Sequence, residues 1–336
     1  MSAVPPTLAD RLAGSLLGLA LGDALGFVVE AAPPDVARAY ARDELDPDRL
    51  GERTHPDFPC GQYSDDTQLA RALLLGVRDA GRWEPLAFAA RVAELFGNGR
   101  PVGAGPGTRA AAERLCGGMR WQETGTPAPY AGNGGAMRVA PLGILLAEDT
   151  AALIEAAAEQ CRVTHQDTRC AGGAVAIAGA AALAARPGPL DGRRLLRELA
   201  DMVGKIDAEM AGVVRGLDAW LDLAPLEAVE RLREARLDPG EGAVWRGIST
   251  HVVPSVAWSL YAALRSPDDY WMAVRTAIEV GGDTDTMAAM AGGIVGGRVG
   301  ISGLPAALLG RLTDRGHWQA DALEALARDC ARCNRG

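Results

Sequence analysis

The feature that most constrains the fold of this chain is the helical spacing of its apolar residues, together with the lack of any long alternating pattern. Apolar side chains that recur every three or four residues line one face of a helix, whereas strands alternate apolar and polar residues. An aromatic content of only 5%, with abundant Ala, Leu and Gly, also favours packed helices. The sequence therefore predicts an all-α fold. Its expected helices span residues 8–26, 66–79, 150–162, 169–186, 192–203, 207–223, 226–236, 255–265 and 270–280.

The first expected helix carries glycine at every fourth position, at Gly14, Gly18 and Gly22. Glycine lowers helix propensity, but a row of glycines on one face lets a neighbouring helix approach closely. Asp23 then interrupts an otherwise apolar face. Two interpretations remain open for Asp23: a buried carboxylate satisfied by backbone N–H groups, or a catalytic group.

The composition limits the classes of protein to which this chain can belong. The best internal break is Arg186-Pro-Gly-Pro189, but polar clusters fall on both sides of it, so we expect a single compact domain over residues 1–336. A net charge of −9 without any basic run argues against a nucleic-acid-binding surface. The apolar run from Leu12 to Gly22 is too short to span a bilayer. We therefore expect no membrane segment and a cytoplasmic location, where the six scattered cysteines would stay reduced.

Two acidic clusters stand at the starts of expected helices. Gly281-Gly-Asp-Thr-Asp-Thr286 offers Asp283, Asp285 and the Thr286 hydroxyl, and Ser64-Asp-Asp-Thr67 offers two more carboxylates. Four carboxylates balance two divalent cations, and an all-oxygen ligand set favours Mg²⁺ or Mn²⁺. Only four histidines occur and none are paired at ligand spacing, so a histidine-metal enzyme is excluded. The alternative is two independent capping clusters on a solvated surface.

Three further segments are candidates for binding. The stretch from Gly97 to Gly107 is rich in glycine, and we expect Thr108 to cap the helix that follows; such a loop can cradle a phosphate or serve as a plain connector. Gly132-Asn-Gly-Gly-Ala-Met-Arg138 is a second glycine-rich turn. Residues 31–60 read as a long loop with little helix, and Glu30 stands at its entrance.

Several of these motifs, in this order, resemble the ADP-ribosylglycohydrolase family. They are Gly22-Asp-Ala-Leu-Gly26 with Glu30, Ser64-Asp-Asp-Thr67, Gly103-Ala-Gly-Pro-Gly107, Gly132-Asn-Gly-Gly-Ala-Met-Arg138, Thr164-His165 and Gly282-Asp-Thr-Asp-Thr286. Each motif is modest alone, but six in the right order, from about residue 12 to 297, are specific. The resemblance implies a compact all-α domain of orthogonal helices with a binuclear Mg²⁺ or Mn²⁺ centre at the bottom of a cleft.

The resemblance also assigns roles to matching positions. It implies a mobile flap over about residues 30–60 whose Glu30 approaches the metals and the reacting ribose. His165 would sit near the ADP-ribose, although a His beside a Thr and an Asp is often a hydrogen-bonded structural residue. Relatives often have Thr where this chain has Ser64. The implied metal ligands are Ser64, Asp65, Asp66, Asp283, Asp285 and Thr286, and the implied ligand-binding residues are Gly103, Gly105, Gly107, Asn133, Gly134, Met137 and His165.

The implied reaction is hydrolysis at C1 of the distal ribose of an ADP-ribosyl group, through a transition state that resembles an oxocarbenium ion. Asp65 or Asp66 would orient the attacking water, and Glu30 would shuttle a proton or act as a flap ligand. The acceptor could be an ADP-ribosylated protein, a nucleic acid or a small molecule, and ADP-ribose would be the product. The motifs do not distinguish these acceptors, because selectivity would lie in the rim formed by residues 31–60, residues 119–131 and the segment around His251. Our default for the assembly is a monomer.

Two rival interpretations remain. An all-α synthase could hold diphosphate through an aspartate-rich helix, but Asp65-Asp-Thr-Gln-Leu69 lacks the later Asp of such a motif. A non-catalytic ADP-ribose-binding member of the same family would be expected to have lost carboxylates, whereas this chain keeps all four together with Glu30. The sequence therefore favours the enzyme.

Overall fold

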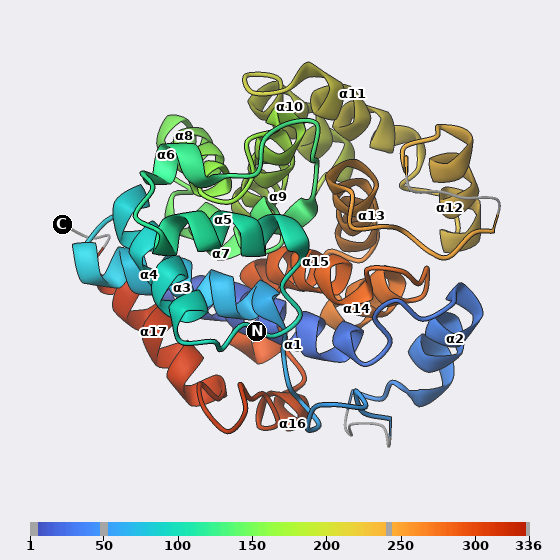
Figure 1. The fold of residues 1–336 in the computed structure, drawn as a ribbon. Coiled ribbons are helices and arrows are strands. Elements are labelled where there is room, and N and C mark those ends of the chain that lie inside the picture. Colours follow the sequence, from blue (N-terminus) through green and yellow to red (C-terminus); the bar gives the residue numbers. More distant parts are fainter. Residues whose placement is uncertain (1–5, 48–52, 240–243, 334–336) are drawn as a thin grey trace.

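The computed structural model describes residues 6–47, 53–239 and 244–333, and within these ranges the chain forms α-helices and no β-sheet (Figure 1). The predicted all-α fold is confirmed. The α-helices are α1 (Leu8–Phe27), α2 (Pro34–Ala39), α3 (Asp65–Ala80), α4 (Pro85–Gly97), α5 (Pro106–Cys116), α6 (Trp121–Thr124), α7 (Ala140–Leu145), α8 (Thr150–Arg162), α9 (Thr168–Ala184), α10 (Gly192–Val203), α11 (Ala208–Gly216), α12 (Pro225–Glu234), α13 (Val252–Arg265), α14 (Tyr270–Ile278), α15 (Thr284–Val299), α16 (Ala306–Leu309) and α17 (Ala320–Cys333).

Helices α1 and α15 form the centre of the fold and pack against each other along their whole length (Figure 1). A Cβ added at any of four α1 glycines would overlap the backbone of α15, so the two helices are in backbone contact. Residue numbers rise along α1 as they fall along α15, which makes the pair antiparallel. The facing pairs are Gly14 with Gly296, Gly18 with Gly292, Gly22 with Ala288, and Gly26 with Thr284.

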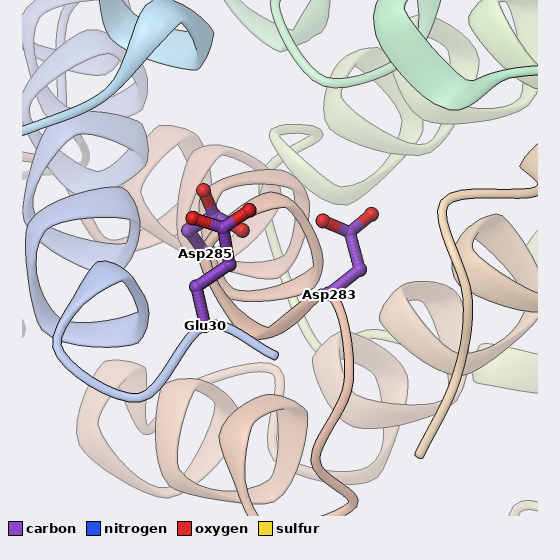
Figure 2. A group of neighbouring side chains, drawn as sticks. All are labelled: Glu30, Asp283 and Asp285. Carbon is purple, nitrogen blue, oxygen red and sulfur yellow. The ribbon is translucent and has the colours of Figure 1, made fainter. Parts of the chain in front are cut away.

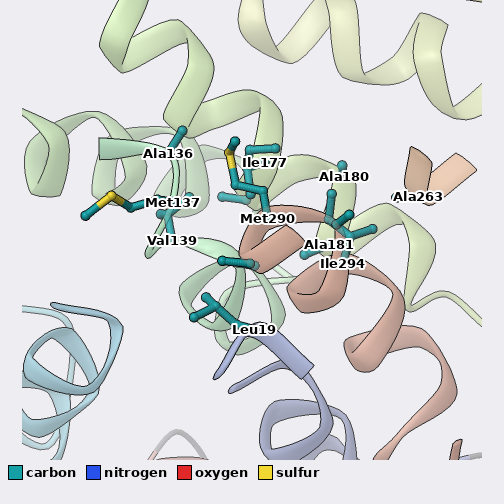
Figure 3. Close-up of a cluster of buried hydrophobic side chains, with 14 of the residues drawn as sticks. Leu19, Ala136, Met137, Val139, Ile177, Ala180, Ala181, Ala263, Met290 and Ile294 are labelled. Atoms are coloured by element: carbon teal, nitrogen blue, oxygen red, sulfur yellow. The ribbon is translucent and has the colours of Figure 1, made fainter. Parts of the chain in front are cut away.

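The hydrophobic core surrounds this central pair. Figure 3 shows Leu19 of α1, Ile177 of α9 and Met290 of α15 in one buried cluster, and all three side chains are fully buried. Helices α7, α9 and α13 contact α15, while α3, α7 and α17 contact α1. Because α1 is buried over most of its length, its apolar residues are not confined to one stripe.

The segment after Glu30 is more helical than the sequence suggested. Pro34–Ala39 forms α2, and Tyr40–Glu44 continues as a π-helical turn. The interpretation of residues 31–60 as a loop with little helix was therefore wrong over this stretch. Pro34 is at the first position of its helix, where the missing N–H carries no penalty. Residues 48–52 of the expected flap lie outside the described residues, and its mobility stays a prediction.

The glycine-rich segment before α5 also differs from expectation. The helix begins at Pro106 with Gly105 as its N-cap, so Thr108 lies inside the first turn and does not cap the helix. Proline presets the backbone dihedral of a first helical residue, and the helix starts three residues closer to the N-terminus than expected. Of the helices in the described residues, none is long and apolar enough to cross a membrane.

Candidate functional site

Three helix ends meet at one point of the fold, and Asp23 joins them. The Asp23 carboxylate accepts hydrogen bonds from the backbone N–H of Ser64 (2.8 Å) and from the backbone N–H (3.1 Å) and hydroxyl (2.6 Å) of Thr67. Asp23 belongs to the last turns of α1, and Ser64 is the N-cap of α3. Of the two interpretations of Asp23, the geometry matches the buried carboxylate satisfied by N–H groups, which here also fixes α3 against α1.

The antiparallel packing of α1 on α15 brings the end of α1 to the start of α15, and this explains why Glu30 meets Asp283 and Asp285. Figure 2 shows the three side chains as neighbours. One carboxylate oxygen from each residue lies within 4.8 Å of one from each of the other two. The backbone N–H of Ala31 donates to the Gly282 carbonyl (2.8 Å), which anchors the chain next to Glu30. Both aspartates are buried, whereas Glu30 is exposed at the rim.

The start of α3 supplies two more buried carboxylates to this cluster. The Thr286 hydroxyl donates to Oδ1 of Asp66 (3.4 Å), which links the starts of α3 and α15. Oδ2 of Asp66 is buried and has no hydrogen-bond partner among the described residues. The backbone N–H of Asp65 donates to the Val102 carbonyl (2.7 Å), and its carboxylate lines the cleft. Ser64 is fully buried as the cap of α3, and its Oγ accepts from the Asp66 N–H (3.3 Å).

The carboxylates raise one another's pKa values because they are buried together. Burial, followed by repulsion from Asp23 and Glu30, raises the pKa of Asp65 to about 8. Burial and neighbouring carboxylates also raise the pKa values of Asp66 and Asp285 well above the usual range. Partial burial of its carboxyl group, and then repulsion from Asp283 and Asp23, raises the pKa of Glu30 to about 7. Near pH 7 and without a bound cation, these carboxyl groups therefore retain protons that a cation would displace.

The residues present fit a divalent cation. Buried carboxylates without a positive partner are costly, and Oδ2 of Asp66 leaves an acceptor unused in the interior. Carboxylate and hydroxyl oxygens are the donor set that Mg²⁺ and Mn²⁺ prefer. The residues that could hold such ions are Glu30, Asp65, Asp66, Asp283, Asp285 and Thr286, which all line one cleft. We call these six residues the acidic half of the cleft.

A second set of lining residues comes mostly from two glycine-rich segments, and we call it the glycine half. It comprises Gly103, Ala104, Gly105, Pro106, Thr108, Tyr130, Gly132, Asn133, Gly134, Met137 and His165. The cleft has a volume of about 320 Å³, within the range of small-ligand sites. The first turn of α5 borders the cavity and presents the positive end of its helix dipole, although Pro106 has no N–H and the Gly107 N–H donates to the Tyr130 hydroxyl. Such a wall suits an anionic ligand.

Asn133 and Gly134 connect the two halves. The Asn133 side chain donates from Nδ2 to Oδ2 of Asp283 (2.5 Å) and to the Ser255 hydroxyl (3.2 Å). A Cβ at Gly134 would lie 2.6 Å from Cε1 of His165, so only glycine lets the imidazole reach the cleft wall. His165 is nearly fully buried, and burial followed by the charge of Arg138 lowers its pKa to about 3. It is therefore neutral at physiological pH.

The structure brings nearly all sequence-predicted site residues to this cleft. Two of the predicted residues do not line the cleft. Ser64 is fully buried and caps α3, and the Gly107 N–H donates to the Tyr130 hydroxyl (3.3 Å). Several further residues line the cleft that the sequence did not single out as ligand-binding. These are Ala104, Pro106, Thr108, Tyr130, Gly132 and Thr250. Tyr130 and Thr250 fall within or beside the expected rim segments, and Thr250 reaches the cleft because the Asn133 N–H donates to its carbonyl (3.0 Å).

Comparison with known proteins identifies the family and the fold. A model of the ADP-ribosylglycohydrolase family matches residues 4–335. The chain belongs to the ADP-ribosylglycohydrolase family. It is 27% identical to the ADP-ribosylarginine hydrolase Tri1 of Pseudomonas putida, over 90% of this chain and 74% of that protein. It is 28% identical to the ADP-ribosyl-[dinitrogen reductase] glycohydrolase of Rhodospirillum rubrum, over 96% of this chain and 98% of that protein.

A solved structure described as an ADP-ribosylglycohydrolase-related protein complex shares the fold of this family member. The match has a TM-score of 0.71 at 28% identity and covers 97% of this chain and 99% of that one. The family resemblance found in the motifs is thus confirmed. The family and the names of its members support a glycohydrolase that removes ADP-ribose by hydrolysis. The acceptors named for the two relatives are said only of those proteins.

Proposed function

We propose that this chain hydrolyses the N- or O-glycosidic bond between C1 of the distal ribose of an ADP-ribosyl group and its acceptor, with Mg²⁺ or Mn²⁺ as cofactor. The observation that carries the proposal is the pairing, in one cleft, of buried carboxylates from α3 and α15 with a glycine-lined wall at the start of α5. The glycine half suits the diphosphate of ADP-ribose, and the acidic half suits the reacting ribose. Two divalent cations held by the acidic half would offset its charge and polarise ligand oxygens.

The side chains of the acidic half would contribute directly to the chemistry. Asp65 or Asp66 would accept a hydrogen bond from the attacking water and orient it toward C1. Glu30 has its pKa raised to about 7, so its carboxyl group can both hold and release a proton near neutral pH. Its exposed position at the rim would let it pass that proton to the departing acceptor or to solvent. The acceptor could belong to a protein, a nucleic acid or a small molecule.

Release of ADP-ribose from a panel of ADP-ribosylated acceptors tests this proposal. The panel would include arginine, serine and nucleobase conjugates and O-acetyl-ADP-ribose, each with Mg²⁺, with Mn²⁺ and with EDTA. We expect release from at least one acceptor class, and we expect EDTA to abolish it. Metal-independent release would contradict the role assigned to the acidic half.

A matched pair of substitutions separates the site from general effects of charge. Asp285→Asn should reduce turnover by about 10³-fold or more, because it removes a buried carboxylate from the centre of the cluster. The control is Asp201→Asn, which changes an exposed carboxylate of α10 that pairs with Arg215 and should leave turnover unchanged. Tight binding of ADP-ribose without release from any acceptor would instead favour a non-catalytic binding protein.

A further inference from the structure

A chain of three buried side chains runs behind the glycine half and ends at His165. The Arg138 guanidinium donates from Nη2 to the Thr164 hydroxyl oxygen (2.8 Å), and that oxygen lies 2.9 Å from Nδ1 of His165. Arg138 also donates to the side chain and carbonyl of Gln160 (2.7 and 2.9 Å), which holds the guanidinium in place. Arg138 and Thr164 are fully buried. No sequence motif assigns a function to this chain of contacts.

The hydrogen-bonding capacity of each group fixes the direction of the Thr164–His165 contact. Arginine has donors only, so the Thr164 oxygen must accept from Arg138. The single hydroxyl hydrogen of Thr164 could then go to Nδ1 of His165 or to the Cys161 carbonyl at 3.5 Å. That carbonyl already accepts from the N–H groups of Thr164 (3.0 Å) and His165 (2.8 Å), which use both of its lone pairs. The hydroxyl therefore donates to Nδ1.

A neutral imidazole that accepts at Nδ1 carries its hydrogen on Nε2. Burial, followed by the charge of Arg138, lowers the pKa of His165 to about 3, so the ring is neutral near pH 7. Nε2 lies beside Gly132 and Gly134, where added Cβ atoms would be 3.1 and 3.3 Å from it, and His165 lines the cleft. Within the described residues, no group accepts a hydrogen bond from Nε2. The donor is thus directed at a ligand.

We propose that Arg138 and Thr164 are positioning residues that hold His165 as the Nε2–H tautomer, which donates a hydrogen bond to an oxygen of bound ADP-ribose. This inference rests on the proposed function for the identity of the ligand. Arg138 suits the task because its charge persists in the interior: burial lowers its pKa to about 10, while the carboxylates of Asp65 and Asp66 favour the charged form. Arg138 thus acts on ligand recognition in the glycine half through Thr164 and His165.

Nitrogen NMR of the ligand-free protein labelled with ¹⁵N-histidine tests the tautomer directly, because protonated and unprotonated ring nitrogens resonate at distinct shifts. His165→Gln assigns the signal among the four histidines of the chain. We expect a protonated Nε2 and an unprotonated Nδ1, with no change between pH 5 and 8. A protonated Nδ1 would overturn the proposal, whether or not the protein proves to be a hydrolase.

Binding of ADP-ribose to Thr164 variants tests the consequence for the ligand. Thr164→Val keeps the shape of the side chain but removes the hydroxyl, so we expect mixed tautomers and about tenfold weaker ADP-ribose binding. Thr164→Ser restores the hydroxyl and should restore both the tautomer and the affinity. In steady-state assays, KM should rise more than kcat falls.

The outcomes separate this inference from the proposed function. If no acceptor releases ADP-ribose, but Thr164→Val weakens ADP-ribose binding and Thr164→Ser recovers it, the positioning role is supported and the hydrolase is not. If Thr164→Val folds with an unchanged melting temperature and binds ADP-ribose as tightly as the unaltered protein, the positioning role is overturned. Should Thr164→Val fail to fold, the tautomer in the unaltered protein and the affinity of Thr164→Ser still decide the question.

Discussion

The two halves of the cleft are built in opposite ways. The acidic half uses charged side chains on the ends of the central helices, and its aspartates are nearly fully buried. The glycine half uses backbone groups from connecting segments, with the neutral His165 as its titratable side chain. In the acidic half the scaffold fixes the positions of side chains, whereas in the glycine half the absence of side chains leaves room for a ligand.

This difference shows which physical interaction each half depends on. Mutual repulsion pushes the carboxylates of the acidic half apart, so rigid packing of α1, α3 and α15 must hold them together. The glycine half carries no such strain, and its residues need only keep N–H groups and one imidazole facing the cavity. We therefore expect substitutions in the scaffold of the acidic half to have larger effects than substitutions in the glycine half.

The largest effect is expected where α1 touches α15. Gly22→Ala adds a Cβ that would overlap the Ala288 carbonyl, and two helix backbones cannot move apart without disrupting the core. We expect a loss of more than about 3 kcal/mol in the free energy of unfolding. The control is Gly212→Ala in α11, where the added Cβ meets nothing within 4 Å and should stabilise the helix by up to about 1 kcal/mol. Urea denaturation measures both, and equal unfolding midpoints would contradict the backbone contact.

The next effect is the dependence of stability on pH and metal. The pKa of Asp65 is raised from about 3.8 to about 8 in the folded protein, so the stability it contributes is fully present below pH 3.8 and is lost as the pH rises toward 8. Metal-free protein should therefore lose stability between about pH 4 and pH 8, and the loss should level off above pH 8. Saturating Mg²⁺ or Mn²⁺ should remove this loss. Melting temperatures across this pH range, with EDTA and with metal, measure the effect.

Replacing one carboxylate makes this prediction specific. Asp66→Asn replaces a buried carboxyl group that must take up a proton on folding near neutral pH, so the metal-free variant should melt a few degrees higher than the unaltered protein. The same variant should gain less from added metal. A lower melting temperature in EDTA would contradict the raised pKa of Asp66.

His165 in the glycine half should change the pH dependence of stability in the opposite direction to Asp65. Its pKa falls from about 6.5 to about 3 on folding, so the unfolded chain binds a proton that the folded protein does not, and stability falls as the pH drops below 6.5. His165→Gln should therefore lose less stability than the unaltered protein between pH 6.5 and 4.5. Above pH 7.5, where His165 is neutral in both states, the difference between the two proteins should no longer change with pH. A constant difference at every pH would contradict the neutral buried imidazole.

The two halves also differed in how well the sequence predicted them. Asp283 and Asp285 were recognisable as candidate metal ligands, because two carboxylates separated by a single residue exceed what one helix cap needs. The sequence could not show that Asp23 fixes the start of α3, since that contact depends on how α1 lies against the rest of the fold. The row of glycines in α1 predicted a close neighbour but not that the neighbour is α15.

Prediction was weaker for the glycine half, because its walls come from contacts between distant loops. Thr250 reaches the cleft through the pairing of residues 131–133 with residues 250–252, which no local pattern encodes. Thr108 was expected to cap a helix, but the helix starts at Pro106. The Thr108 side chain therefore lies inside the first turn, near Gly134. Arg138 carries no periodic or spacing signal of its buried contacts. The residue types alone thus predicted which side chains form the acidic half. The members of the glycine half could be found only once the fold had brought distant loops together.

A smaller effect is expected from Gly105→Ala in the glycine half. An added Cβ there meets no protein atom within 4 Å, so the folded state should be unaffected, and Gly105 lines the cleft. If a phosphate lies against this turn, the methyl group would occupy its place and weaken ADP-ribose binding by about tenfold or more. Gly118→Ala, at another turn with open space around it, controls for general effects of the substitution, although its positive φ makes it strained. Unchanged affinity in Gly105→Ala would place the diphosphate elsewhere in the cleft.

The smallest effect is expected from Ser64, which lies beneath the acidic half and not in the cleft. Its Oγ accepts from the Asp66 N–H (3.3 Å) as the cap of α3, while Asp23 holds its backbone N–H. Ser64→Thr keeps the hydroxyl and should change turnover by less than about threefold, whereas Ser64→Ala should cost about 1 kcal/mol of stability through the lost cap. If Ser64 acts only as a cap, the metal affinity of Ser64→Ala measured by calorimetry should stay within about threefold of the unaltered protein. A much larger loss of metal affinity would make Ser64 a ligand, as the family resemblance implies, and would extend the acidic half one residue further toward the N-terminus.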